Sequence, residues 1–404
     1  MNLQNTIKFN FFAEKNRKLV TFLCYFLPFA VLGGYLASLI LRGFMIPSSG
    51  YYLIHYLYTY DHGFIARGFI GEVLSWFFET VSDELTEYVA TIFSILLTIA
   101  LSFSIGKALS KTKDNPEHFF IVAILSTLSC LCPVGFHLYC MDNRFDKLIW
   151  AIALFSVFLA GRKFAIWLVP VLCIIATLIN PVFLFTSMIL VAIVLLYYFY
   201  SSNYSVKNGI ICAVSYLSMI ALGVFALISE KQHGFASASE MVDYYFARYE
   251  GELSKGVYDA FVNVWLIDYF ADTATLLEQS YESYYKVQHS EFFVDLIFLI
   301  FPTYLLTVTF WKKCIKLSDN KFQKFIFFLC AISPVVYIPI ALLVFQTSKY
   351  FYNNLFVQVG LMIFFVTQNN TAVSETFKKA FEWAKRHLVV SAIISVYILS
   401  VVIL

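Results

Sequence analysis

Long apolar stretches separated by short polar segments run through most of the chain. A helix needs about 20 mainly apolar residues to cross a bilayer, and about eleven segments of the chain approach this length. They are 19–41, 86–108, 118–136, 147–160, 164–180, 182–200, 208–229, 291–311, 323–346, 351–367 and 388–404. The pattern therefore predicts an all-α, polytopic bundle of transmembrane helices, in which Asn180-Pro181 separates two spans because proline interrupts a helix.

Composition supports a membrane protein and excludes several other classes. Of the 404 residues, 60% are hydrophobic and only 13% are charged, whereas soluble domains carry about 25% charged residues. We find no basic face or motif that would bind nucleic acid. A Walker loop and a GxGxxG fingerprint are also missing from the sequence, so ATP-driven transport and dinucleotide chemistry have no support. The apolar run from residue 19 is too long for a signal-peptide core and has no cleavage site after it, which predicts a retained helix.

The distribution of basic residues predicts the orientation of the spans. If the spans alternate from a cytoplasmic N-terminus, the inner segments and the adjoining ends of the spans contain nineteen of the 28 lysine and arginine residues. Cytoplasmic segments of membrane proteins carry such an excess of positive charge. We therefore expect a multi-pass protein of the plasma membrane with its N-terminus in the cytoplasm, surrounded by membrane lipids.

Two predicted external segments, 42–85 and 230–290, are too long to be simple turns. Long loops in compact proteins are usually functional. Each contains a tyrosine-rich amphipathic stretch, 51–58 in the first loop and 257–266 in the second. We expect these stretches to form interfacial helices with their rings at the depth of the lipid headgroups.

The first external loop carries the densest group of reactive side chains. Asp61, His62 and Arg67 lie within a glycine-rich run, and glycine lets the backbone approach a ligand closely. Asp61 could accept a proton from a hydroxyl group, and Arg67 could bind a phosphate through two hydrogen bonds. The alternative is structural: Asp61 would cap the following helix, and Arg67 would extend to lipid headgroups.

Two further external turns contain candidate groups. Asp142, Arg144 and Asp146 lie between the third and fourth spans, where the carboxylates could bind a divalent cation or form an acid/base pair with Asp61. A local ion pair that ends the helices is the alternative. Lys349 and Tyr350 precede the tenth span; Lys349 could contact a lipid phosphate or mark the membrane boundary. In the 230–290 loop, carboxylates alternate with tyrosines, a mixture that suits sugar binding but also occurs at ordinary membrane interfaces.

This layout resembles that of the C-type (GT-C) membrane glycosyltransferases over spans 1 to 8, residues 19–311. In that family an acidic residue lies in the first external loop, a second often follows span 3, and a large external loop follows span 7. Asp61, Asp142 or Asp146, and segment 230–290 stand at these places. The chain departs from the common acidic pair of the first loop, because His62 follows Asp61. The next acid is Glu72, eleven residues after Asp61, and we expect it within a helix.

The resemblance implies a catalytic module over residues 1–311, followed by C-terminal transmembrane helices over 312–404. It implies transfer of a sugar from a polyprenyl-phosphate donor to a glycan, lipid or protein acceptor at the outer face, with inversion at the sugar carbon. Asp61 would be the base, and Asp142 or Asp146 would assist it or hold a divalent cation. Arg67, Arg144 and Lys349 would bind phosphate, with His62 and Tyr350 also contacting substrate.

Two other classes remain open from the sequence. An envelope polysaccharide polymerase or ligase also has many spans and one large external loop, but it would depend mainly on external arginines. A transporter would place polar groups at mid-bilayer and show repeated halves, and we find neither pattern. The run from Asp61 to Gly68 is similar to a motif of bacterial membrane proteins, so a bacterial cell envelope is the expected setting.

Overall fold

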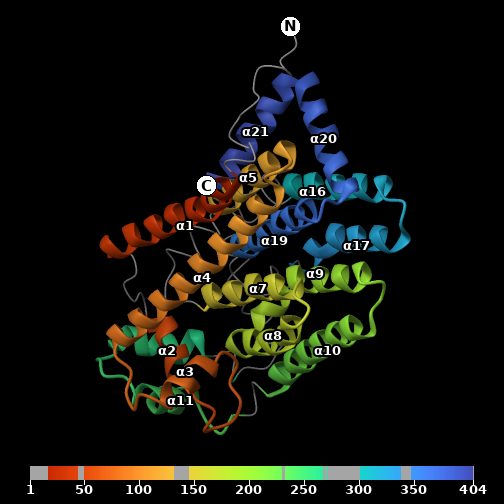
Figure 1. The fold of residues 1–404 in the computed structure, drawn as a ribbon. Coiled ribbons are helices and arrows are strands. Elements are labelled where there is room, and N and C mark those ends of the chain that lie inside the picture. The colour runs from red at the N-terminus through yellow and green to blue at the C-terminus, as the bar shows by residue number, and fades with distance from the viewer. Residues whose placement is uncertain are drawn as a thin grey trace.

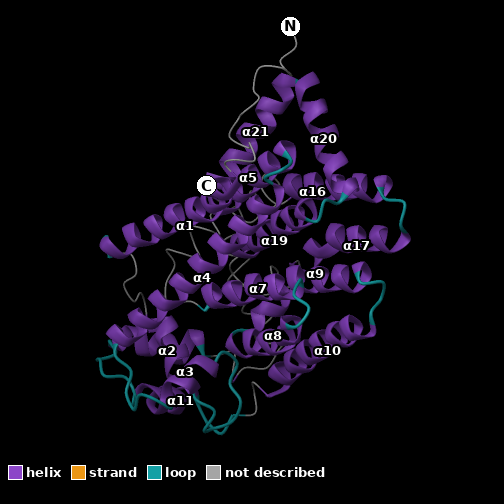
Figure 2. Ribbon diagram, in the orientation of Figure 1, coloured by secondary structure: helices purple, strands orange, loops and turns teal. Residues whose placement is uncertain are grey.

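The computed structural model describes residues 17–43, 50–131, 145–229, 233–266, 270, 301–337 and 347–403. Within these ranges the secondary structure is helical, and the one backbone bridge of β type pairs Val81 with Tyr249. Figure 2 shows helices joined by loops throughout the described chain. The described residues therefore form an all-α protein.

Among the described residues, three helices are long and apolar enough to cross a membrane: α1 (Arg17–Leu41), α4 (Asp83–Thr112) and α10 (Val206–Ser229). Shorter helices complete the bundle. They are α5 (Pro116–Leu131), α7 (Asp146–Ala160), α8 (Leu168–Ile179), α9 (Met188–Ser201), α16 (Phe301–Leu317), α17 (Lys321–Ile332), α19 (Thr347–Thr367), α20 (Thr371–Arg386) and α21 (Leu388–Ile403).

Each of the eleven predicted apolar segments overlaps a helix of the structure, although 118–136, 291–311, 323–346 and 388–404 lie partly outside the described residues. The predicted break at Asn180-Pro181 is confirmed. Helix α8 ends at Ile179, and a 3₁₀ turn, Pro181–Phe185, follows. The Asn180 side chain accepts a hydrogen bond from the Val182 amide, which satisfies a donor that the turn leaves open.

The bundle core lies where α4 packs against α1 and α7, and where α7 packs against α8 and α9 (Figure 1). Buried polar groups connect its helices. The Trp150 indole of α7 donates to Asn353 of α19 at 2.8 Å, and the Trp311 indole of α16 donates to Gln358 of α19 at 2.6 Å. Because buried polar groups are costly without a partner, these bonds fix how α19 sits among its neighbours.

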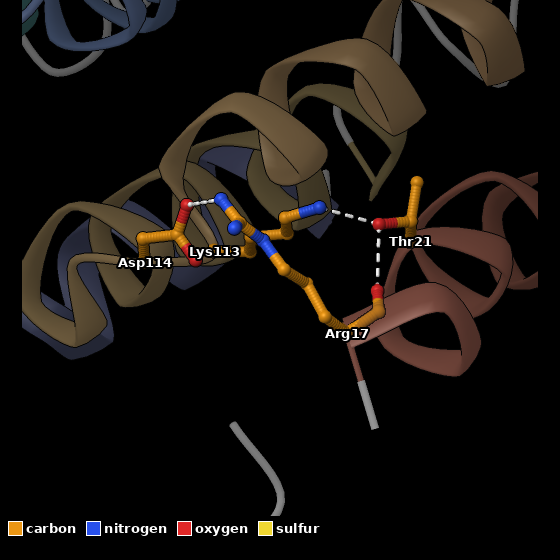
Figure 3. A network of polar contacts seen from close by, with 4 residues as sticks. All are labelled: Arg17, Thr21, Lys113 and Asp114. Atoms are coloured by element: carbon orange, nitrogen blue, oxygen red, sulfur yellow. Dashed lines mark hydrogen bonds and ion pairs between the residues drawn. The ribbon is translucent and has the colours of Figure 1, made fainter. Parts of the chain in front are cut away.

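Contacts join several predicted cytoplasmic segments at one end of the helices. The Arg17 guanidinium binds Asp114 at 2.9 Å, and Lys113 donates to Thr21, so the start of α1 lies beside the end of α4 (Figure 3). Lys207 similarly donates to the Lys163 carbonyl. Later in the chain, the Phe322 ring of α17 stacks on Tyr200 of α9, and the Cys314 thiol of α16 donates to the Thr376 hydroxyl of α20.

Short helices gather beyond the first residues of α4, at the lower end of the molecule in Figure 1. They are α2 (Gly50–Leu57), α3 (Phe69–Ser75), α11 (Ala238–Phe246) and α12 (Lys255–Ala260), the last continued by a π-helical turn, Phe261–Trp265. Ser82 and Ser237 cap α4 and α11 by accepting backbone amide hydrogen bonds. The two tyrosine-rich stretches, 51–58 and 257–266, are thus largely helical, as predicted.

The expected position of the first-loop tyrosine rings is wrong for two residues. Tyr56 and Tyr58 are fully buried inside the protein. The Tyr56 ring meets Phe145 edge-on at 5.1 Å, and the Tyr58 ring meets Tyr245 at 5.0 Å between centroids. Aromatic rings bury large apolar areas, and here other rings of the protein, not the lipid headgroups, cover those areas.

Candidate functional site

Asp61 lies in the turn between α2 and α3, where its side chain is exposed. Its Oδ2 accepts a hydrogen bond from the Thr59 hydroxyl at 2.7 Å and one from the Tyr244 hydroxyl at 3.3 Å. The alternative role as a helix cap is wrong, because α3 begins at Phe69 with Gly68 at its N-cap. The two hydroxyl donors orient the carboxylate and leave Oδ1 without a hydrogen bond from described residues.

His62 connects the Asp61 turn to the large loop. The His62 ring packs at 4.6 Å from the Phe235 ring and edge-on at 4.4 Å from the Tyr244 ring. The His62 carbonyl accepts from the Gly234 amide at 2.9 Å. Residues of two long loop segments, far apart in sequence, therefore form one surface beside the carboxylate.

Arg248 holds the same two loops together. Its guanidinium donates to the Leu57 carbonyl at 2.9 Å and, more weakly, to the carbonyls of Phe78 and Glu79. Its own carbonyl accepts from the Val81 amide at 2.8 Å. Arg248 thus satisfies backbone groups at the loop junction, and its guanidinium is already occupied by main-chain oxygens.

Tyr244 and Tyr245 complete the junction from α11. The Tyr245 hydroxyl donates to the Thr59 carbonyl at 3.1 Å. Burial, and then the nearby Asp61 charge, raises the pKa of Tyr244. The Tyr244 hydroxyl therefore stays protonated at neutral pH and can keep donating to Asp61.

Arg67 has a backbone φ of 70°, in the left-handed region that side chains other than glycine rarely adopt. It stands in the turn that leads into α3. Strained residues of this kind concentrate at functional sites. Glu72, the next acid after Asp61, lies within α3 as expected, and its carboxylate accepts from the Tyr60 amide at 2.8 Å.

Asp146 begins α7 and is buried, as is Lys147 beside it. The preceding ring, Phe145, lies against Tyr56 and at 6.2 Å from the His55 ring, so the start of α7 packs against α2. The structure therefore brings the Asp146 end of α7 to the first loop. It does not pair the carboxylates, because the hydrogen bonds of Asp61 go to Thr59 and Tyr244. Asp142 and Arg144 lie outside the described residues.

Lys349 and Tyr350 lie in the first turn of α19, and their side chains are outside the described part. One turn further, Asn353 accepts from Trp150 near the start of α7. The starts of α7 and α19 are therefore neighbours. In the described part of the chain, no three His, Cys, Asp or Glu side chains gather closely enough to hold a metal ion.

Sequence reasoning missed Thr59 as the direct partner of Asp61 and gave Tyr244 no role beyond that of one tyrosine among many in its loop. A hydroxyl residue two positions before an aspartate carries little signal of its own. The link to Tyr244 spans 183 positions, so no local pattern could have shown it.

Comparison of the chain with protein-family models, curated proteins and solved structures finds no match. The geometry of the loop junction and the sequence pattern are therefore the basis for assigning a function.

The buried imidazole of His55 predicts a pH dependence of stability. Burial, followed by the Arg67 charge, holds the pKa of His55 well below 6.5. Below pH 6.5 the unfolded chain therefore binds a proton that the folded protein does not, so stability falls as the pH drops, by about 1.4 kcal/mol at pH 5.5. Thermal unfolding in detergent between pH 5 and 8 measures this slope. His55→Phe should flatten the slope, whereas His387→Phe, at an exposed residue, should leave it; equal slopes in both variants would contradict the assignment.

Proposed function

We propose that this protein is a membrane glycosyltransferase, which moves a sugar from a polyprenyl-phosphate donor to a glycan, lipid or protein acceptor at the outer face of the membrane. The observation that supports this most is the exposed Asp61 carboxylate, oriented by Thr59 and Tyr244 where two external loops meet. A positioned carboxylate is the group that a transfer to a hydroxyl acceptor requires.

In the proposed step, the acceptor oxygen attacks the anomeric carbon of the donor sugar while Asp61 takes the acceptor proton. The bond from that carbon to the phosphate oxygen breaks, and the polyprenyl phosphate leaves with the electron pair. A single displacement of this kind inverts the anomeric carbon. Oδ1 of Asp61, which has no hydrogen-bond partner among the described residues, is the oxygen that would receive the proton.

The surroundings of Asp61 suit both the sugar and the phosphate of such a donor. The rings of His62, Phe235 and Tyr244 lie within 5.5 Å of one another and form an aromatic surface beside the carboxylate. Aromatic rings can stack on the apolar face of a sugar. Arg67, in its constrained turn, is the proposed phosphate ligand, with Arg144 and Lys349 as further candidates and Tyr350 as a substrate contact.

The proposal includes about eleven crossings with the N-terminus in the cytoplasm and the loop junction outside. Contacts support this arrangement, because several predicted inner segments meet one another and the two predicted outer loops dock together. The polymerase alternative would depend mainly on external arginines. Arg248 is poorly suited to that role, because its guanidinium already donates to backbone carbonyls.

Purified protein in liposomes with labelled polyprenyl-phosphate hexoses and pentoses, supplied together with an extract of envelope glycans, lipids and proteins as acceptors, tests the proposal. We expect the label to leave at least one donor and free polyprenyl phosphate to accumulate in equal amount. Absence of release across the whole panel, with folded protein present, would contradict it. Repeating the assay with EDTA decides whether a divalent cation, with Asp142 and Asp146 as its candidate ligands, takes part.

Arg67→Gly should lower transfer about tenfold to a hundredfold in this assay, because it removes a charged phosphate ligand. Glycine adopts a positive φ without strain, so the backbone of the turn can be retained. Asn203→Gly is the matched control, since Asn203 also has a positive φ (53°) but lies after α9, away from the loops. If both variants transfer at the wild-type rate, Arg67 does not bind the donor.

A further inference from the structure

A second feature of the molecule is a cavity of about 120 Å³ enclosed by α4, α7, α9 and α19, with a contribution from α5. Most of its wall is apolar and includes Leu101, Leu154, Phe356 and Ile363. The helices that line it come from both halves of the sequence, and α4, α7, α9 and α19 lie near the centre of Figure 1. None of the residues assigned to the loop junction lines this cavity.

Positive charge gathers at one side of the cavity. Lys107 and Lys111, one helical turn apart on α4, both line it. The Lys107 ammonium lies 4.2 Å from the centre of the Phe158 ring, and the Arg162 guanidinium lies 4.8 Å from the centre of the same ring. None of these three cations has an acidic partner among the described residues, so their mutual repulsion favours binding of an anion.

Ser126 is a second, independent indication that the cavity binds a ligand. This residue of α5 is 5% exposed and lines the cavity. Its hydroxyl has no hydrogen-bond partner in the described part of the chain. Buried hydroxyl groups are nearly always paired, and a ligand oxygen in the cavity would supply the missing partner.

The cavity lies far from the Asp61 junction. Asp83, at the start of α4, accepts a hydrogen bond from Tyr249 of the large loop. Lys107 follows 24 residues later on the same helix, about 36 Å away at the usual rise of an α-helix. That distance is close to the thickness of a bilayer, whose hydrocarbon core is about 30 Å. A membrane crossing by α4, which is long and apolar enough for one, would place these cations at the depth of the lipid headgroups on the side opposite the Asp61 junction.

We propose that this cavity binds the phosphate head group of an anionic membrane lipid, with Lys107, Lys111 and Arg162 around the phosphate and the lipid chain along the apolar wall. A phosphate accepts several charge-assisted hydrogen bonds, which matches a cluster of cations without counter-charges. The apolar wall favours a lipid over a free phosphate ion, because only a lipid brings a hydrocarbon chain to cover it. This inference does not depend on the glycosyl-transfer proposal.

Lipid retention by the full-length protein tests it. The protein is purified from vesicles of phosphatidylcholine containing a minor fraction of labelled phosphatidylglycerol, and the lipid that stays bound is counted. We expect wild type to retain the anionic lipid about tenfold better than Lys107→Gln/Lys111→Gln or Arg162→Gln, from the loss of charge-assisted hydrogen bonds. Lys113→Gln is the matched control, because Lys113 follows α4 at the same end but is bound to Thr21 (Figure 3).

Three results would overturn the proposal. Equal retention by wild type and by both cavity variants would show that these cations hold no lipid. An equal loss in Lys113→Gln would show that general surface charge, and not the cavity, attracts the lipid. Displacement of the bound label by millimolar inorganic phosphate would show that the site takes the free ion. Arg162 and Lys111 are exposed, so the single variants Arg162→Gln and Lys111→Gln keep the test valid if the double variant does not fold.

Discussion

Replacing Asp61 by asparagine is expected to lower sugar transfer by about 10²–10⁴-fold, the usual contribution of a general base. Asparagine keeps the size of the side chain and an oxygen that accepts from Thr59 and Tyr244. It loses the ability to take the acceptor proton. The loss should therefore appear in kcat, with the thermal midpoint of unfolding unchanged, in the liposome assay with a polyprenyl-phosphate donor.

Asp243→Asn is the matched control for Asp61→Asn. Asp243 lies on α11 next to Tyr244, and its carboxylate accepts from the Tyr258 hydroxyl at 2.9 Å. This change removes a charge from the same surface without touching the proposed base, so we expect transfer within about twofold of wild type, as for a surface substitution. Unaltered transfer in Asp61→Asn would exclude the role of Asp61, and an equal loss in Asp243→Asn would point to surface charge instead.

Gly71→Ala is expected to destabilise the first external loop by about 3 kcal/mol, at the upper end of the range for overpacked sites. A Cβ atom at Gly71 would stand 2.2 Å from the Tyr58 carbonyl oxygen and 2.9 Å from that of Tyr56. These are backbone atoms at the end of α2 and just beyond it, so they cannot move aside as a flexible side chain could. Helix α3 would have to shift away, and the Asp61 turn between the two helices would shift with it.

Thermal unfolding in detergent and the transfer assay together measure the effect of Gly71→Ala, and both should fall. Gly34→Ala in α1 is the control, because nothing lies within 4 Å of a Cβ atom at Gly34. Alanine favours a helix over glycine, so this variant should be neutral or up to about 1 kcal/mol more stable. Wild-type stability in Gly71→Ala would mean that α2 and α3 do not approach so closely in solution.

Local features of the sequence predicted much of the helical structure. Long apolar runs predicted the helices of the bundle, because the length of such a run and its lack of charge are properties of consecutive residues. Asn180-Pro181 predicted a break because proline restricts the residue before it. The position of Glu72 within a helix was predicted in the same way. The number of membrane crossings, the side on which the loops lie and the chemistry at Asp61 remain predictions.

Contacts between distant residues could not be predicted in this way. Asp61 and Tyr244 are 183 positions apart, and Arg248 lies 191 positions from the Leu57 carbonyl that it binds. Tyr56 and Tyr58 were expected at the membrane interface, yet they are buried against Phe145 and Tyr245. Their amphipathic pattern predicts that one face is covered, but it does not distinguish lipid headgroups from protein as the cover.

The sequence alone thus determined where the helices form, where one of them breaks and which segments between them carry acidic and basic groups. Only the tertiary structure decided that the two long loops dock, that hydroxyls of Thr59 and Tyr244 orient Asp61, and that Lys107 and Lys111 line one side of a cavity, with Arg162 against the same Phe158 ring as Lys107. The physical reason is the range of the forces involved. Backbone hydrogen bonds and hydrophobic periodicity act within a few turns of helix, whereas a site is completed by the packing of side chains that meet only after the helices have assembled.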